Sequence, residues 1–77
     1  MQTKFKRHQK VKLLISPLEE DIESYAEDDV KVKPGAIGEV NIILPNGRYH
    51  LKISDKKGDA LAYVAMDEEN LENAEKN

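Results

Sequence analysis

The chain has 77 residues, of which 39% are hydrophobic and 35% are charged. This length allows one domain, and a domain this small buries only about 60% of the surface that its unfolded chain exposes. An elaborate enclosed active site is therefore not expected. The sequence contains no cysteine, which excludes disulfides and thiolate metal sites and favours a reducing, cytoplasmic location. No apolar run in the sequence is long enough to span a bilayer, so no membrane partner is expected.

The net charge of −3 is sorted along the chain. Residues 1–15 hold five basic side chains and no acidic one, whereas residues 16–29 hold seven acidic side chains and no basic one. Such sorting suggests a surface with two electrostatically different sides. The alternative is that neighbouring segments neutralise each other in the fold.

The predicted elements begin after a basic N-terminal arm, residues 1–9, in which Phe5 either anchors the arm on the core or leaves it loose. Residues 10–15 alternate with a period of two and predict a first strand, which Ser16–Pro17 ends because proline cannot donate to a sheet ladder. Residues 1–77 are expected to form a single domain, in which residues 10–72 make up a barrel and residues 73–77 a frayed tail.

A long acidic connection follows over residues 17–33. Leu18, Ile22 and Tyr25 lie at positions i, i+4 and i+7, which indicates a short helical turn. A structureless loop of this length is unusual in a compact domain. The connection is therefore expected either to pack through these apolar groups or to be functional.

Three further strands are predicted after the turn at Pro34–Gly35, the first over residues 36–44 with a bulge or a close backbone approach at Gly38. Pro45–Asn46–Gly47 is a strong hairpin signal, since Asn and Gly both tolerate positive φ. The third strand carries Tyr49, Leu51 and Ile53 on one face. The fourth spans residues 60–66 and is apolar on both faces; Asp67 then caps a short helical turn that Leu71 pins down.

The order of elements predicts a mostly β fold of four to five antiparallel strands with a long acidic first loop and a short C-terminal helical turn. Short strands of this kind bury their faces best by curling into a small barrel. The alternative is a four-stranded sheet with a helix from the acidic segment packed across it. The expected core is Val11, Leu13, Ile15, Val40, Ile42, Leu44, Tyr49, Leu51, Ile53, Leu61, Tyr63, Val64 and Leu71.

Five stretches of the sequence resemble small SH3-like barrels, whose pattern is a G-x-x-V-x-l strand, a loop, a v-x-x-G-x-x-G-x-V strand, a g-x-Y-x-V-x-F strand and a closing v-x-x-e-x-L-e. The stretches are residues 9–14, 32–40, 47–53, 62–64 and 67–72. The chain departs from the pattern at Gln9, where glycine is usual, and at Ile53, where an aromatic residue is common.

Families that share this pattern include short SH3-like proteins of uncharacterised role and accessory subunits of photosystem I, of ferredoxin–thioredoxin reductase and of nitrogenase maturation. The resemblance implies an SH3-like antiparallel barrel that serves as a docking or assembly module without chemistry of its own. It carries no functional residue over to this chain. The likeness extends over residues 9–72.

Residues that could carry chemistry do not form a recognisable constellation. His8 and His50 are the only histidines, and a metal site needs at least three converging ligands. The serines lack the context of a nucleophile elbow, and the acidic loop lacks the central glycine of a calcium loop. We therefore expect no enzyme activity, no catalytic residue, no metal and no cofactor.

Two partner surfaces follow from the charge pattern. An acidic face can dock on a basic protein surface, and it would comprise Glu19, Glu20, Asp21 and Tyr25. The alternative is a KOW-like module that binds RNA or another nucleic acid, because the turn at residues 35–40 is similar to that of ribosomal KOW-type barrels. That surface would comprise Lys10, Lys12, Lys33, Arg48 and Lys52. Another protein is the expected partner, and the oligomeric state is left open.

Overall fold

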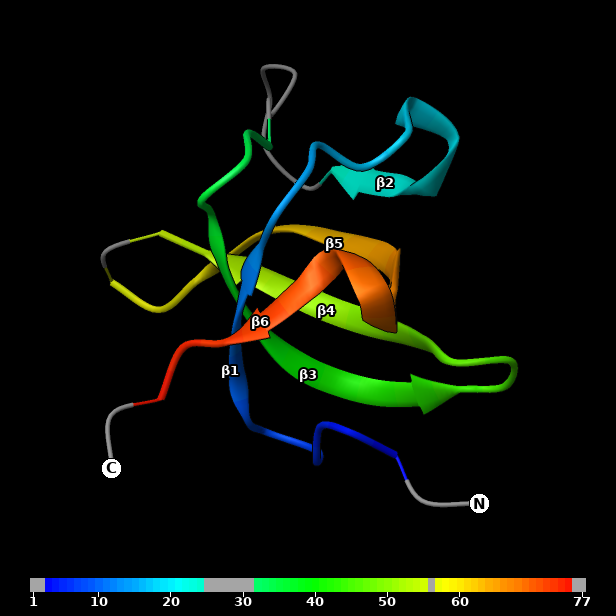
Figure 1. Cartoon of the computed structure of the whole chain (residues 1–77). Coiled ribbons are helices and arrows are strands. Elements are labelled where there is room, and N and C mark those ends of the chain that lie inside the picture. Colours follow the sequence, from blue (N-terminus) through cyan, green and yellow to red (C-terminus); the bar gives the residue numbers. More distant parts are fainter. Residues whose placement is uncertain (1–2, 25–31, 56, 76–77) are drawn as a thin grey trace.

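The computed structural model describes residues 3–24, 32–55 and 57–75, which form one six-stranded antiparallel sheet (Figure 1). The strands are β1 (Lys10–Leu13), β2 (Ile22–Ser24), β3 (Ile37–Leu44), β4 (Arg48–Ser54), β5 (Ala60–Asp67) and β6 (Leu71–Asn73). Single 3-10 turns, η1 (Glu19–Asp21) and η2 (Glu68–Asn70), precede β2 and β6. The spatial order is β2-β5-β4-β3-β1-β6, so that β2 and β6 are the two edges of an open sheet.

The prediction of a mostly β fold is confirmed. The helical turn predicted in the acidic connection is present as η1, although it is shorter than the predicted span from Leu18 to Tyr25. Within the described residues this connection contains no α-helix: η1 is a single turn, and Ile22 begins strand β2, which pairs with β5. A six-stranded open sheet is found where four to five strands in a barrel were expected. The two strands that were not predicted are β2 and β6, and each has three residues. They extend a sheet whose long strands are β3, β4 and β5.

One face of this sheet encloses a single core. The buried hydrophobic residues are Phe5, Val11, Leu13, Val32, Val40, Tyr49, Leu51, Ile53, Ala62, Val64, Met66 and Leu71. Strands at opposite ends of the strand order contribute to the same cluster, which requires the sheet to curl. Figure 1 shows the consequence, since β1 runs steeply across the direction of β3 and β4.

The hairpin between β3 and β4 is confirmed. Asn46 and Gly47 have φ values of 64° and 72°, the left-handed conformation that the turn requires. Beyond the turn, Tyr49, Leu51 and Ile53 all face the core, as their alternation predicts. The period-two pattern therefore fixes the orientation of β4.

A β-bulge in β3 changes which side chains face the core. Val40 pairs with Leu51, yet Ile42 pairs with His50, so Asn41 is an extra residue on this strand. An extra residue inverts the alternation that follows it. Ile42 is consequently 49% exposed, and its predicted place in the core is wrong.

The bulge lies beyond Gly38, where the sequence indicated a bulge or a close backbone approach. The close approach is present at Gly38. A Cβ atom on this residue would lie 3.0 Å from Ile53 Cδ1 and 3.3 Å from Leu51 Cβ. Glycine lets β3 pack closely over the buried face of β4 at this point.

The other predicted core residues that fall outside the core are Ile15, Leu44, Leu61 and Tyr63. Ile15 lies beyond the end of β1 and is exposed, and Leu44 is partly exposed in the bulged strand. In β5 the residues that face the core are Ala62, Val64 and Met66, so Leu61 and Tyr63 project from the opposite face.

The N-terminal arm is anchored on the core. Phe5 is 1% exposed and makes an edge-to-face contact with Tyr49, with ring centroids 5.5 Å apart. His8 N–H donates to the carbonyl of Val40 at 2.7 Å, and Val40 N–H donates to that of Gln9 at 2.9 Å. Of the two possibilities that the sequence left open for Phe5, anchoring is the correct one.

The C-terminal helical turn is confirmed as η2, but the predicted side-chain cap is not present. Asp67 precedes η2 without capping it, and its carboxylate accepts a hydrogen bond from Arg48 Nε at 2.9 Å. The backbone N–H of Glu68 donates to the carbonyl of Gly47 at 2.8 Å. Leu71 follows in β6 and is buried, as predicted.

Candidate functional site

The segment that joins β1 to η1 carries an unusual amount of exposed apolar surface. Leu14, Ile15 and Leu18 are 46%, 47% and 62% exposed, and they are three of the five large hydrophobic residues that the described part of the chain exposes. The backbone from Leu14 to Leu18 spans at most about 14 Å, because each residue extends the chain by no more than about 3.6 Å. These side chains and the exposed Glu19 and Glu20 are called the 14–20 segment below.

Backbone hydrogen bonds hold this segment at both ends. Leu14 N–H donates to the carbonyl of Asn70 at 2.9 Å, which places the start of the segment beside η2. Asp21 N–H donates to the carbonyl of Leu18 at 2.9 Å, and Ile22 N–H donates to that of Glu19. The start of the segment is therefore tied to η2, and its end forms the turn η1.

The acidic residues at the end of the segment divide into two kinds. Arg48 bridges two carboxylates, with Nη2 3.2 Å from Asp21 Oδ2 and Nε 2.9 Å from Asp67 Oδ1. This pairing ties η1 to β4 and neutralises Asp21. The side chains of Glu19 and Glu20 are exposed and have no hydrogen-bond or ion-pair partner within the described residues.

The predicted partner-binding residues are therefore only partly brought together. Glu19 and Glu20 lie side by side and are accessible, whereas Asp21 is engaged by Arg48. Tyr25 lies outside the described residues. Its role as a binding residue stays a prediction, as do those of the other three.

The basic residues of the alternative surface do not form a continuous patch in the described structure. Lys12 pairs with Glu72 across β1 and β6 at 3.1 Å, and Arg48 is held by its two aspartates. Lys33 is exposed on the connection to β3. The remaining two members of this set, Lys10 and Lys52, lie together on the outer face of the sheet, with Glu39 between them in the strand register.

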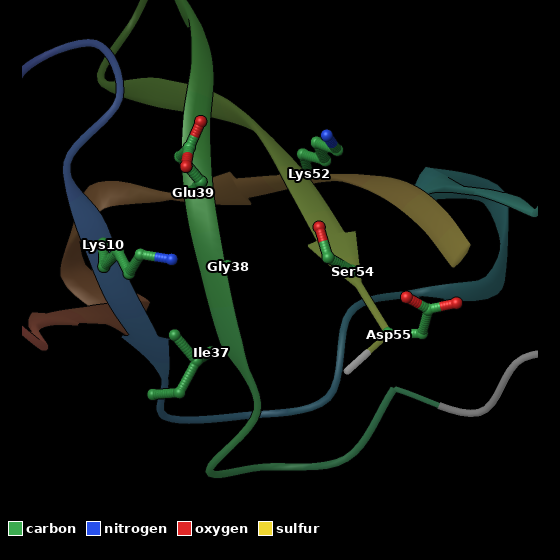
Figure 2. A pocket seen from close by; sticks show the side chains of 7 residues that line it. All are labelled: Lys10, Ile37, Gly38, Glu39, Lys52, Ser54 and Asp55. Atoms are coloured by element: carbon green, nitrogen blue, oxygen red, sulfur yellow. The ribbon is translucent and has the colours of Figure 1, made fainter. Parts of the chain in front are cut away.

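Lys10 and Lys52 line a shallow hollow of about 220 Å³ on this outer face (Figure 2). Its other lining residues are Ile37, Gly38, Glu39, Ser54 and Asp55. Neither lysine has an ion-pair partner in the described part of the chain, but the hollow contains two carboxylates for its two ammonium groups. The hollow is therefore electrically balanced and gives an anion little advantage over a cation.

The two histidines have local partners. His8 Nδ1 lies 3.5 Å from Glu39 Oε2 in an exposed pair. His50 is half-buried. It stacks on Tyr63 with ring centroids 5.0 Å apart, and its Nδ1 lies 3.1 Å from Asn41 Nδ2.

One buried polar cluster connects the N-terminal arm to η2. The Tyr49 hydroxyl donates to the Glu68 carboxylate and accepts from Phe5 N–H at 3.3 Å. Glu68 also accepts from Lys4 N–H at 3.1 Å. Burial, followed by the bond to Glu68, raises the pKa of Tyr49, while the bonds from Tyr49 and Lys4 lower the pKa of Glu68. These three hydrogen bonds fasten the arm to β4 and η2.

Within residues 3–24, 32–55 and 57–75, no group of three or more His, Asp or Glu side chains is placed to hold a metal ion. The described part of the chain also contains no helix that is long and apolar enough to cross a membrane.

Sequence reasoning missed the apolar part of the 14–20 segment. It placed Ile15 in the core because the alternation of Val11 and Leu13 was extended through Ile15, but β1 ends at Leu13. A signal for exposure was available in the sequence. Pro17 ends regular strand pairing, and the leucine after it directly precedes acidic residues, which indicates a surface position for Leu18.

Comparisons with protein-family models, with curated proteins and with solved structures found no match to this chain. The function is therefore argued below from the residues and the geometry of the described structure alone.

Proposed function

We propose that the protein is a non-catalytic protein-binding module whose contact surface is the 14–20 segment. The observation that carries this proposal is the exposure of Leu14, Ile15 and Leu18 on one short, backbone-anchored segment. Contiguous exposed apolar side chains rimmed by polar groups are typical of surfaces that bind another protein. The aliphatic side chains would supply the buried centre of the interface, and Glu19 and Glu20 would lie on its rim.

The scaffold that we propose for this surface is an SH3-like barrel. The curled sheet around one core supports that proposal, as does the β3–β4 hairpin at the position that the resemblance implies. In such a scaffold the connection after the first strand is presented by rigid strands on both sides. A rigid frame favours binding because less conformational entropy is lost when the partner docks.

The nucleic-acid alternative has weaker support. Two of its five basic residues, Lys12 and Arg48, are already paired with carboxylates, and Lys10 and Lys52 share their hollow with two more. Phosphate binding depends on unopposed positive charge and weakens steeply with salt. A gel shift with single-stranded RNA at low ionic strength would favour this alternative over protein binding.

The proposed surface is tested by comparing the wild-type protein with a Leu14→Ser, Leu18→Ser variant as baits in the same cell extract. Both residues are exposed, so far-ultraviolet circular dichroism and the melting temperature are expected to stay close to wild type. We expect the wild-type bait to retain specific proteins that the variant loses. Equal recovery of the same proteins by a folded variant would exclude the 14–20 segment as the contact surface.

A further inference from the structure

The charges around the 14–20 segment are predominantly negative. Glu19 and Glu20 end the segment, and both are exposed and unpaired within the described residues. The hydrogen bond from Leu14 to Asn70 brings η2 to the other end of the segment, and η2 contains the exposed Glu69.

Positive charge near the segment is limited in the described structure. Arg48 reaches η1, but its guanidinium is used by Asp21 and Asp67. Lys33 is exposed near the beginning of the segment, because Gly35 N–H donates to the carbonyl of Leu13 at 2.7 Å. Among the described residues, three unpaired carboxylates and one lysine lie around the segment, so that the described rim of the apolar surface is acidic.

We infer that the 14–20 segment binds a protein surface on which apolar side chains are surrounded by lysine or arginine. This inference rests on the proposed function and adds the chemical class of the partner. Complementary charges increase the rate of encounter and suppress wrong partners, whereas a like-charged rim disfavours docking. The apolar side chains provide attraction that salt does not screen, and the carboxylates provide selectivity that salt reduces.

The test uses two synthetic amphipathic peptides of equal length and leucine content, one with lysine and the other with glutamate at every polar position. Binding is followed by methyl resonances of Leu14, Ile15 and Leu18 in the isotopically labelled full chain. We expect the lysine peptide to shift these methyl groups and to bind at least about tenfold more tightly than the glutamate peptide. The difference is expected to shrink as the salt concentration rises.

Charge variants separate the rim from the overall charge of the protein. The Glu19→Lys, Glu20→Lys variant is expected to lose or reverse the preference. Asp59→Lys, Glu75→Lys makes the same change in net charge at exposed positions elsewhere, and it is expected to retain the preference.

Three results would overturn the inference: equal affinity for the two peptides, no binding of either peptide, or the same loss of preference in both charge variants. Failure of the proposed function is a different result. In that case the Leu14→Ser, Leu18→Ser bait would recover the same proteins from the extract as the wild-type bait, independently of the result with the two peptides. If that bait loses its partners while the charge variants behave like wild type, the binding surface stands and the partner class is wrong.

Discussion

Replacing Tyr49 with phenylalanine tests how strongly the N-terminal arm is fastened to the core. The substitution keeps the buried ring and its contact with Phe5 but removes the hydroxyl. Phe5 N–H, which is buried, then loses its acceptor, and Glu68 loses its strongest donor. A buried donor that is left without a partner costs about 1 to 3 kcal/mol. For a domain of this size, that loss lowers the melting temperature by about 5 to 20 °C.

Urea denaturation followed by circular dichroism measures this loss, and an unchanged slope shows that the folded state remains compact. A Glu68→Ala background provides the control. There the Tyr49 hydroxyl has already lost its acceptor, so Tyr49→Phe is expected to cost less than in the wild-type protein. A midpoint for Tyr49→Phe equal to that of wild type would refute the role of the cluster. An equal cost in both backgrounds would show that only the Phe5–Tyr49 bond contributes and that the Tyr49–Glu68 bond does not.

Three other perturbations follow from the structure. Because Glu68 has a lowered pKa, its stabilising contribution is present above the ordinary glutamate pKa and is lost as the pH falls through the lower, folded-state value. Between neutral and acidic pH, the melting temperature should therefore decline less for Glu68→Gln than for wild type. Identical declines would contradict this assignment. Gly38→Ala places a methyl group 3.0 Å from Ile53 Cδ1 and 3.3 Å from Leu51 Cβ, and it is expected to destabilise the fold by about 1 to 3 kcal/mol in urea titrations. An unchanged midpoint would contradict the close packing of β3 on β4 at this position. Leu13→Ala should lower the free energy of unfolding by about 2 to 5 kcal/mol because Leu13 is buried, whereas Leu18→Ala should change it by less than about 0.5 kcal/mol because Leu18 is exposed. Similar losses for the two variants would show that the assigned exposures are wrong.

Strand β4 shows what the sequence pattern can predict. Its residues alternate cleanly, and the Asn46–Gly47 turn starts the strand at a defined place, so Tyr49, Leu51 and Ile53 could all be oriented correctly. Both signals are local. They require no knowledge of which strand lies alongside.

Strands β3 and β5 show where this reasoning ends. Nothing local distinguishes Asn41 as the extra residue of a bulge, so the inversion at Ile42 could not be foreseen. Residues 60–66 are apolar on both faces, and their orientation is set by pairing with β4, which brings Val64 opposite Leu51 and Met66 opposite Tyr49. Register between strands is a tertiary property, and a one-residue difference exchanges the two faces.

The candidate site was predicted in part for a similar reason. Charge sorting identified Glu19 and Glu20 as accessible acidic groups, and the structure keeps them exposed. The same sorting could not show that Asp21 would meet Arg48, because that contact depends on where β4 lies. The exposure of Leu14 and Ile15 could not be predicted, because the sequence does not show that β1 ends at Leu13. An apolar residue next to a strand is expected in the core unless the end of the strand is known.

The pairing of β1 with β6 has a consequence for how the chain folds. Leu13 lies opposite Leu71, which is 58 positions further along the sequence, so one edge of β1 stays open until β6 arrives. Contacts between residues so far apart in sequence form slowly, because a long loop must close before the pairing is gained. An apolar strand whose edge is open during this time can pair with another chain, so refolding at high protein concentration is expected to lose material to aggregation.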